Sequence, residues 1–305
     1  MPGRVFISCG QRPGKERSVA KKVADLLQSE FGLTTYLAFR IQSLDDIMTI
    51  TKELSASDYY LFIDFCRDPS SRDDLACSLF THQELALAHH LGFHRNMIAL
   101  QEANAPLEGF LKYVLGNPRS FTTEAELLDI VKEEVAARGW SADFSRNLVV
   151  VDMKHVDCQY GDHTGQAQWR VWQVYLENRR PDLAAVDTVC ILDEIKYGGS
   201  VTGHKSLDRA YLKWAGVGGY SLTILPKDFG IVNVFAARAD SPGVFLHSLR
   251  DVVPREPIIT MDGEYELIYK VFAHGFPLLN FTMKFCVKTV WQKGMPTEIQ
   301  AQLLV

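Results

Sequence analysis

Residues 59–65 read Tyr-Tyr-Leu-Phe-Ile-Asp-Phe, and this stretch decides the fold class of the first half of the chain. It is apolar throughout except for Asp64, which comes late in the run. A strand that is apolar on both sides must be covered on both faces of its sheet, as in a parallel sheet packed between helices. Similar apolar runs occur at Val5–Ser8, Leu33–Ala38 and Met97–Leu100, with a further possible strand at Ser120–Phe121.

Helical patterns separate these strands. Val19, Val23 and Leu27 recur at helical spacing and predict a helix over residues 15–31, which Gly32 ends. Further helices are predicted over residues 44–54, near 109–115, over 78–91, and from a cap at Thr122 or Thr123 to Ala137. The alternation of strands and helices predicts an α/β domain over residues 1–142, with its ligand site at the carboxyl ends of the strands.

The pattern changes after residue 142. Residues 168–176 alternate with a period of two, as a strand does, and turn signals rich in Gly, Pro and Asp separate the segments that follow. The other predicted strands are Leu148–Met153, Val186–Ile195, Tyr211–Trp214, Ser221–Leu225, Ile231–Ala237, Tyr265–Phe272 and Asn280–Val287. Residues 143–305 are therefore predicted to form an antiparallel β-sandwich. Trp169, Trp172, Trp214 and Tyr175 are expected either in its core and sheet faces or on an aromatic recognition surface.

Composition excludes several classes of protein. The chain of 305 residues carries 32 basic and 37 acidic side chains, a net charge of −5, which argues against a nucleic-acid partner. Its six cysteines contain no Cys-x-x-Cys pair, as expected in a reducing compartment. No segment has the length and apolar character of a signal peptide or a membrane span, so we expect a cytoplasmic protein without membrane contact.

The predicted helix over residues 78–91 contains the most informative spacing. Glu84 follows Phe80 by one helical turn, so both project from one face. A carboxylate beside an aromatic ring suits a reaction that passes through a ribosyl cation, because the carboxylate stabilises positive charge at the anomeric carbon. The alternative is structural: Thr81-x-x-Glu84 also fits a capping box with Thr81 as the N-cap residue.

Other polar residues have weaker signals. Arg12 or Arg40 is a candidate partner for a pyrophosphate, and backbone amides near Gly10 are candidate phosphate donors, although the chain has no GxGxxG or Walker A motif. Asp58 is a candidate to orient a ribose or to end a helix, and the structural role is favoured. Asp64 is expected to bind either loop amides or ligand. The histidines lack the spacing of metal ligands, so no metal site is expected.

Several segments of the first half follow one another in a characteristic order. They are the strand Val5–Ser8, a charged helix, the strand Thr34–Ala38 with the loop Phe39–Ser43, the segment Leu54–Asp58, and the aromatic-x-x-x-Glu pattern from Phe80 to Glu84. Together they resemble a TIR (Toll/interleukin-1 receptor) domain of the prokaryotic, NAD-cleaving type. The resemblance covers roughly residues 3–138, and the family usually has Trp where this chain has Phe80.

The resemblance implies a flavodoxin-like parallel sheet in which Glu84 is catalytic and Phe80 shapes the pocket. It places a ligand-facing loop at Cys9, Gly10, Gln11 and Arg12, and a mobile loop at Phe39, Arg40 and Gln42. The implied activity is NAD+ glycohydrolase or ADP-ribosyl cyclase at the nicotinamide-ribose bond, with NAD as substrate and no separate cofactor. The implied role is a prokaryotic antiviral effector that homo-oligomerises through its TIR-like domain, while the β-sandwich senses a protein or small-molecule trigger.

Two other functions stay open. Many animal TIR domains are nonenzymatic scaffolds, and the β-sandwich would then be a partner-binding module. A nucleoside deoxyribosyltransferase-like enzyme shares the parallel sheet and a Glu that acts at an anomeric carbon, but its other substrate-binding residues are not found in this sequence.

Overall fold

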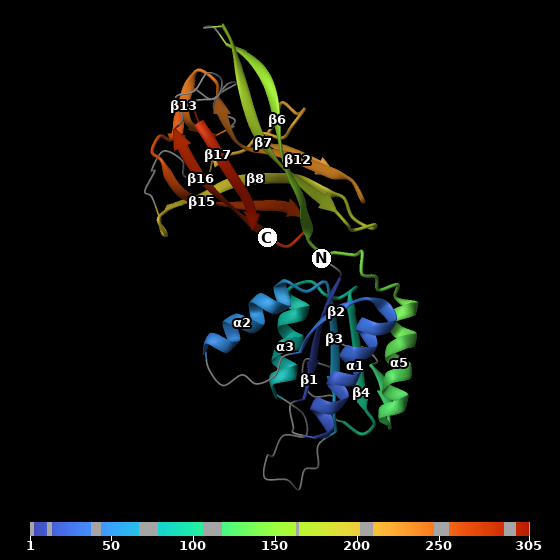
Figure 1. Cartoon of the computed structure of the whole chain (residues 1–305). Coiled ribbons are helices and arrows are strands. Elements are labelled where there is room, and N and C mark those ends of the chain that lie inside the picture. Colours follow the sequence, from blue (N-terminus) through green and yellow to red (C-terminus); the bar gives the residue numbers. More distant parts are fainter. Residues whose placement is uncertain are drawn as a thin grey trace. The chain divides into compact units, whose positions relative to one another are not determined.

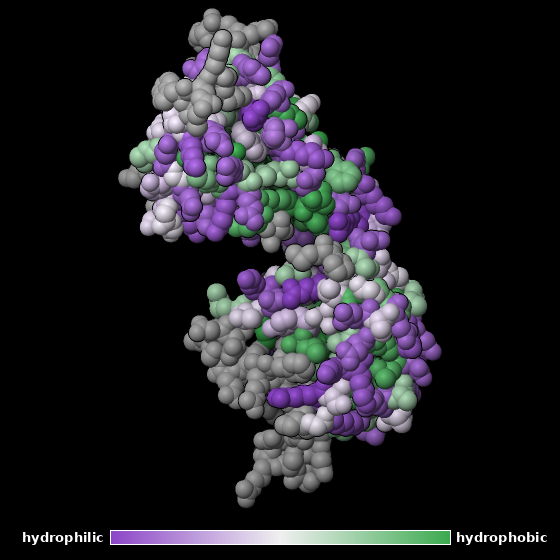
Figure 2. All heavy atoms as spheres, viewed as in Figure 1, coloured by the Kyte–Doolittle hydropathy of each residue, from purple (hydrophilic) through white to green (hydrophobic). Residues whose placement is uncertain are grey.

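The chain is described by a computed structural model that divides into two compact units (Figure 1). The first unit is Met1–Arg146 and the second unit is Asn147–Val305. The described residues are 3–10, 14–37, 44–66, 79–105, 118–162, 165–201, 210–246, 256–289 and 297–304. The helix predicted near residues 109–115 lies outside them. On the face in view, hydrophilic and hydrophobic residues are interspersed over both units (Figure 2).

The described part of the first unit contains one parallel sheet of five strands in the order β2-β1-β3-β4-β5. The strands are β1 (Arg4–Cys9), β2 (Thr34–Leu37), β3 (Tyr59–Asp64), β4 (Met97–Glu102) and β5 (Arg119–Phe121). The helices are α1 (Lys15–Phe31), α2 (Leu44–Ser55), α3 (Leu79–His90) and α5 (Glu124–Ala137). The predicted α/β class is confirmed, and the strand order is the one found in flavodoxin-like sheets.

Side chains alternate between the two faces of this sheet, and each face has its own core. Val5, Ile7 and Cys9 of β1 pack on the face that α1 and α5 cover. Phe6 packs with Tyr60 and Phe62 on the other face, against residues of α2 and α3 (Figure 1). This division decides which polar residues at the strand ends can meet.

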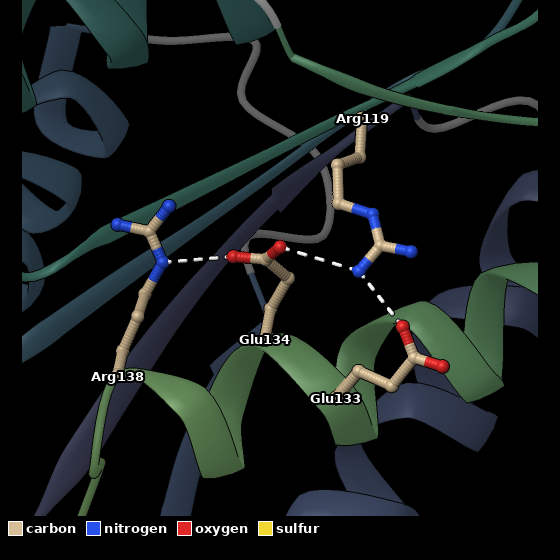
Figure 3. Close-up of polar contacts among 4 residues, drawn as sticks. All are labelled: Arg119, Glu133, Glu134 and Arg138. Carbon is tan, nitrogen blue, oxygen red and sulfur yellow. Dashed lines mark hydrogen bonds and ion pairs between the residues drawn. The ribbon is translucent and has the colours of Figure 1, made fainter.

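Local signals end and begin the helices as predicted. Gly32 has a φ of 67°, the left-handed conformation that glycine adopts readily, and its amide caps α1 by donating to Gln28. Thr123 is the N-cap of α5, where its hydroxyl accepts from the Glu126 amide at 3.2 Å. Near the other end of α5, Arg119 of β5 pairs with Glu133 and Glu134, and Glu134 also accepts from Arg138 (Figure 3).

The segment after α5 is bound to the amino ends of the strands. Tyr59 stacks on Trp140 with ring centroids 4.5 Å apart, and its hydroxyl accepts from the Ser141 amide. Asp58 is buried and accepts from the Arg4 amide at 3.0 Å, the Ser145 hydroxyl at 2.8 Å and the Arg146 amide at 2.8 Å. These bonds hold residues up to 146 on the first unit, which explains why the division falls four residues beyond 142.

The role of Asp58 is therefore structural, because it lies at the edge of the sheet opposite the carboxyl ends of the strands. Burial raises the pKa of Asp58 above its usual value, while the hydrogen bonds from Arg146, Arg4 and Ser145 lower it in part. The carboxylate thus joins β1, β3 and the segment at 145–146.

Asp58→Ala is expected to lower the free energy of unfolding of the first unit by about 2–3 kcal/mol, because it leaves buried donors without an acceptor. Urea unfolding followed by the helical circular dichroism signal measures this, since every described helix belongs to the first unit. Asp129→Ala, at an exposed position of α5, is the control. An equal midpoint for the two variants would contradict the structural role of Asp58.

The described part of the second unit consists of two antiparallel sheets that share one core, which confirms the predicted β-sandwich. One sheet has the order β14-β13-β12-β7-β6 and the other β10-β8-β15-β16-β17, with β9 and β11 also paired to β8. The bounds are β6 (Leu148–Asp162), β7 (Gly165–Asn178), β8 (Ala185–Tyr197), β9 (Ser200–Val201), β10 (Ala210–Tyr211), β11 (Ser221–Ile224), β12 (Phe229–Arg238), β13 (Ser241–Phe245), β14 (Pro257–Ile259), β15 (Gly263–His274), β16 (Leu279–Thr289) and β17 (Thr297–Leu304).

Aromatic rings connect the two sheets through the shared core. Trp172 of β7 stacks on Phe235 of β12, which in turn stacks on Phe285 of β16, with centroids 4.9 Å and 5.0 Å apart. Trp169, Trp172 and Trp214 are all buried, so they form no recognition surface. Tyr175 is partly exposed, with Lys154 Nζ 5.1 Å from its ring centroid. Trp169 belongs to a smaller cluster with Val171 on the other face of β7, which means that both faces of this strand are covered.

Candidate functional site

The carboxyl ends of the first unit's strands define the candidate site. β1 lies between β2 and β3, so the chain leaves β1 toward one neighbour and later returns to the other. Such a reversal of strand order leaves a crevice at the carboxyl ends, where open α/β sheets bind ligands. β1 ends at Cys9 and β3 at Asp64 on this edge.

Helix α3 brings Glu84 to this edge. Thr81, Glu84, Leu85 and Ala88 recur at helical spacing and are the buried side of the helix. Leu85 and Ala88 pack in the core formed with Phe6 and Phe62. Because Glu84 is on the same side of the helix, this packing holds its side chain against the sheet. Glu84 is only 6% exposed.

The carboxyl group of Glu84 meets a hydroxyl of β1. The Ser8 Oγ donates to Glu84 Oε2 at 2.5 Å, and Ser8 is itself fully buried. Burial raises the pKa of Glu84 from 4.5 to about 7, although the hydrogen bond from Ser8 lowers it in part. Near neutral pH the group is therefore divided between its acid and its carboxylate, a state suited to reactions in which charge appears at a substrate.

The capping-box alternative for Glu84 is wrong. Helix α3 begins at Leu79, so Thr81 lies inside the helix and not at its N-cap. The carboxyl group of Glu84 binds Ser8 of β1, seventy-six positions away in the sequence. Glu84 therefore joins two elements of the fold and does not cap its own helix.

Cys9 lies on the opposite face of the sheet from Glu84. Its side chain is buried among Val5, Ile7 and residues of α1, as the alternation along β1 requires. Burial, followed by the charges of Glu84 and Glu16, raises the pKa of Cys9 to about 12. The thiol is thus neutral and inaccessible, and the structure does not bring this predicted ligand-facing residue together with Glu84.

The remaining predicted site residues are described only in part. Gly10 is buried directly after β1, and Phe80 belongs to α3 one turn before Glu84, although the position of its side chain is outside the description. Gln11, Arg12, Phe39, Arg40 and Gln42 lie outside the described residues.

Sequence reasoning missed three polar residues on the Glu84 face. The sequence predicts Ser8 only as the end of a strand, although a polar residue at an alternating position of an apolar strand is a signal of a site residue. Tyr60 of β3 is fully buried, and burial raises its pKa well above the usual value; the charge of Glu84 raises this pKa further, whereas Ser8 lowers it in part. His82 lies with its Nε2 3.6 Å from Asp64 Oδ2, so Asp64 faces α3.

The described residues meet neither the requirements of a metal site nor those of a membrane-spanning helix. No group of three His, Cys, Asp or Glu side chains in the described ranges is placed to hold a metal ion. No helix in those ranges combines the length and hydropathy needed to cross a membrane.

A cavity of about 440 Å³ lies on the second unit and contains no residue of the first. It is lined by polar residues of β8, β15, β16 and β17, including Lys196, Glu264 and Gln300. Glu266 and Lys284 in its wall form an ion pair at 2.8 Å. The cavity therefore presents both acidic and basic side chains, and it lies on the second unit, whereas Glu84 belongs to the first.

Comparisons with known proteins add little. No protein-family model matches the chain, and no curated protein matches it. Among solved structures, Northeast Structural Genomics Consortium target SoR45 is 13% identical with a TM-score of 0.21, over 52% of this chain and 86% of that one. Translation elongation factor SelB from Methanococcus maripaludis, in complex with the GTP analogue GPPNHP, is 9% identical with a TM-score of 0.33, over 99% and 78%. TM-scores this low support no statement about fold or function.

The raised pKa of Glu84 has a consequence for stability. Between about pH 4.5 and pH 7 the folded protein binds a proton at Glu84 that the unfolded chain has released, so stability falls as pH rises. The stabilisation that the protonated Glu84 contributes is fully present below about pH 4.5 and is lost as pH rises through about 7.

Glu84→Gln removes this dependence, because the amide stays neutral and still accepts from Ser8. Relative to the variant, the wild type is expected to lose about 3 kcal/mol of unfolding free energy between about pH 4.5 and about pH 8. Urea unfolding at several pH values, followed by helical circular dichroism, measures the difference. Parallel pH profiles for the two proteins would mean that Glu84 is not a buried acid.

Proposed function

We propose that this protein is an NAD+ glycohydrolase or ADP-ribosyl cyclase that acts at the nicotinamide-ribose bond. The observation that carries the proposal is Glu84, a buried acid held by Ser8 at the carboxyl edge of a parallel sheet. The order of segments that resembles a prokaryotic TIR domain supplies the substrate class. NAD is the substrate, and no separate cofactor enters the reaction.

In the proposed reaction, the bond between the anomeric carbon and nicotinamide breaks, and its electron pair leaves with nicotinamide. The ribosyl carbon becomes cationic, and the Glu84 carboxylate stabilises that charge. Water then adds to the carbon and releases a proton, giving ADP-ribose. Attack by a group of the same molecule gives a cyclic product instead.

The proposed biological role is an effector of prokaryotic antiviral defence in the cytoplasm. Homo-oligomerisation through the TIR-like unit would activate it, with the loop that contains Phe39, Arg40 and Gln42 completing a neighbouring site. The β-sandwich would respond to a protein or small-molecule trigger. The net charge of the whole chain, −5, makes a nucleic-acid trigger the less favoured one.

A nonenzymatic scaffold is the second candidate, and one observation favours it. Glu84 is 6% exposed, which is less than expected of an acid that must reach a substrate. In this alternative, the TIR-like unit only associates with other copies, and the β-sandwich binds a partner. The two candidates differ in whether Glu84 affects turnover or only stability.

Concentrated wild-type protein is expected to consume NAD and release nicotinamide, and Glu84→Gln is expected to lower the rate at least about 100-fold. Chromatography of the reaction mixture measures nicotinamide and separates ADP-ribose from a cyclic product. Gln cannot supply the negative charge, although it keeps the size and the hydrogen bond of the side chain.

Glu134→Gln is the matched control, since Glu134 lies on α5 against the other face of the sheet. This variant is expected to keep the wild-type rate. Wild-type protein that leaves NAD intact even when it is forced to cluster would favour the scaffold. Equal rates for Glu84→Gln and the wild type would remove Glu84 from the mechanism.

A further inference from the structure

Three polar side chains from three elements meet beneath α3. Ser8 comes from β1, Tyr60 from β3 and Glu84 from α3. Tyr60 pairs in register with Phe6, two residues before Ser8, so Tyr60 and Ser8 project from the same face of the sheet. Ser8 and Tyr60 are fully buried, which makes water a poor partner for either hydroxyl.

The hydrogen-bond capacity of these groups is unequal. Ser8 has one O–H, which it donates to Glu84 Oε2, and its oxygen still has lone pairs to accept with. The Tyr60 hydroxyl has no hydrogen-bond partner among the described residues, although Ser8 is close enough to affect its pKa. A hydrogen bond from the Tyr60 hydroxyl to the Ser8 oxygen would satisfy this buried donor while Ser8 still donates to Glu84.

The ionisable groups near Glu84 are neutral or directed elsewhere, so the Ser8 hydroxyl is the polar group that most directly affects the charge of Glu84. Tyr60 of β3 lies on the Glu84 face of the sheet, whereas Cys9 of β1 lies on the opposite face, and burial raises the pKa of each so that both are neutral at pH 7. Glu16 of α1 affects Cys9 on the other face, and His82 lies over Asp64 at 3.6 Å. The Ser8 hydroxyl is the donor that binds the Glu84 carboxylate directly.

We propose that Ser8 is a positioning residue for Glu84 and that Tyr60 supports it as a donor to the Ser8 oxygen. Ser8 commits Oε2 of the carboxyl group to the sheet, which leaves Oε1 for the anomeric carbon of a nucleotide substrate. A donor at this place also favours the carboxylate over the acid. The inference deepens the proposed function and rests on it for the identity of the substrate.

Ser8→Ala tests the inference in the full-length chain. Without the donor, the Glu84 pKa rises by about one unit, so kcat at pH 7 falls about fivefold and the acidic limb of the pH profile moves upward by about one unit. The KM for NAD stays within about twofold, because Ser8 does not touch substrate. Ser8→Thr, which keeps the hydroxyl, is expected to restore the wild-type profile.

Tyr60→Phe tests separately whether Tyr60 supports Ser8 as a donor. If Tyr60 supports Ser8, its removal shifts the acidic limb in the same direction by less than Ser8→Ala does. If Tyr60 only fills space, losing an unpaired buried hydroxyl stabilises the protein and leaves the pH profile unchanged, which would overturn this part. Ser57→Ala is the matched control, since Ser57 is buried but donates to the Glu53 carbonyl.

Carbon NMR of glutamate carboxyl groups makes the test independent of turnover. The Glu84 signal, assigned by its loss in Glu84→Gln, is titrated in the wild type and in each variant. An unchanged Glu84 pKa in folded Ser8→Ala would overturn the inference, whether or not the protein cleaves NAD. If the Glu84 pKa rises in Ser8→Ala but the wild type leaves NAD intact, the Ser8 contact is supported while the proposed function fails.

Discussion

The hydrogen bond between Ser8 and Glu84 is the contact on which the candidate site of the first unit depends. It joins residues seventy-six positions apart and requires that α3 lie directly on the sheet. Moving a carboxyl group out of water is unfavourable, and one hydroxyl does not replace its hydration. The apolar contacts of Leu85 and Ala88 with Phe6 and Phe62 supply the attraction that keeps the acid in place. The position of the site therefore depends on the core.

Much of the first unit could be predicted from sequence, because its signals are local or simple. Apolar strands such as residues 59–64 require cover on both faces, and Gly32 and Thr123 mark helix ends by their own conformations. The site was harder, because it depends on which face each side chain takes. Cys9 and Ser8 are neighbours in sequence but belong to opposite faces, and only the choice of face separates a core thiol from the partner of Glu84.

The second unit shows a different limit of sequence reasoning. The long alternating strands were predicted, whereas β13 begins with Ser241-Pro242-Gly243, which has the composition of a turn. β17 was missed because Thr297–Leu304 contains residues common in helices, although Ile299, Ala301 and Leu303 pack against the core with a period of two. The predicted strand at 211–214 is shorter, with β10 ending at Tyr211 and Trp214 forming a single bridge to Val232. Pairing partners distant in the sequence decide each of these cases.

Comparison of two buried acids supports the role proposed for Glu84. Asp58 accepts from two backbone amides and a hydroxyl, so its carboxylate replaces lost water with donors from the chain. Within the described residues, Glu84 accepts only from Ser8, and its pKa rises to about 7. A side chain such as Leu at this position would avoid a cost of about 3 kcal/mol at high pH. An acid that lowers stability without a compensating set of donors is typical of a functional site, and a scaffold that used α3 only for packing would have no reason to keep it.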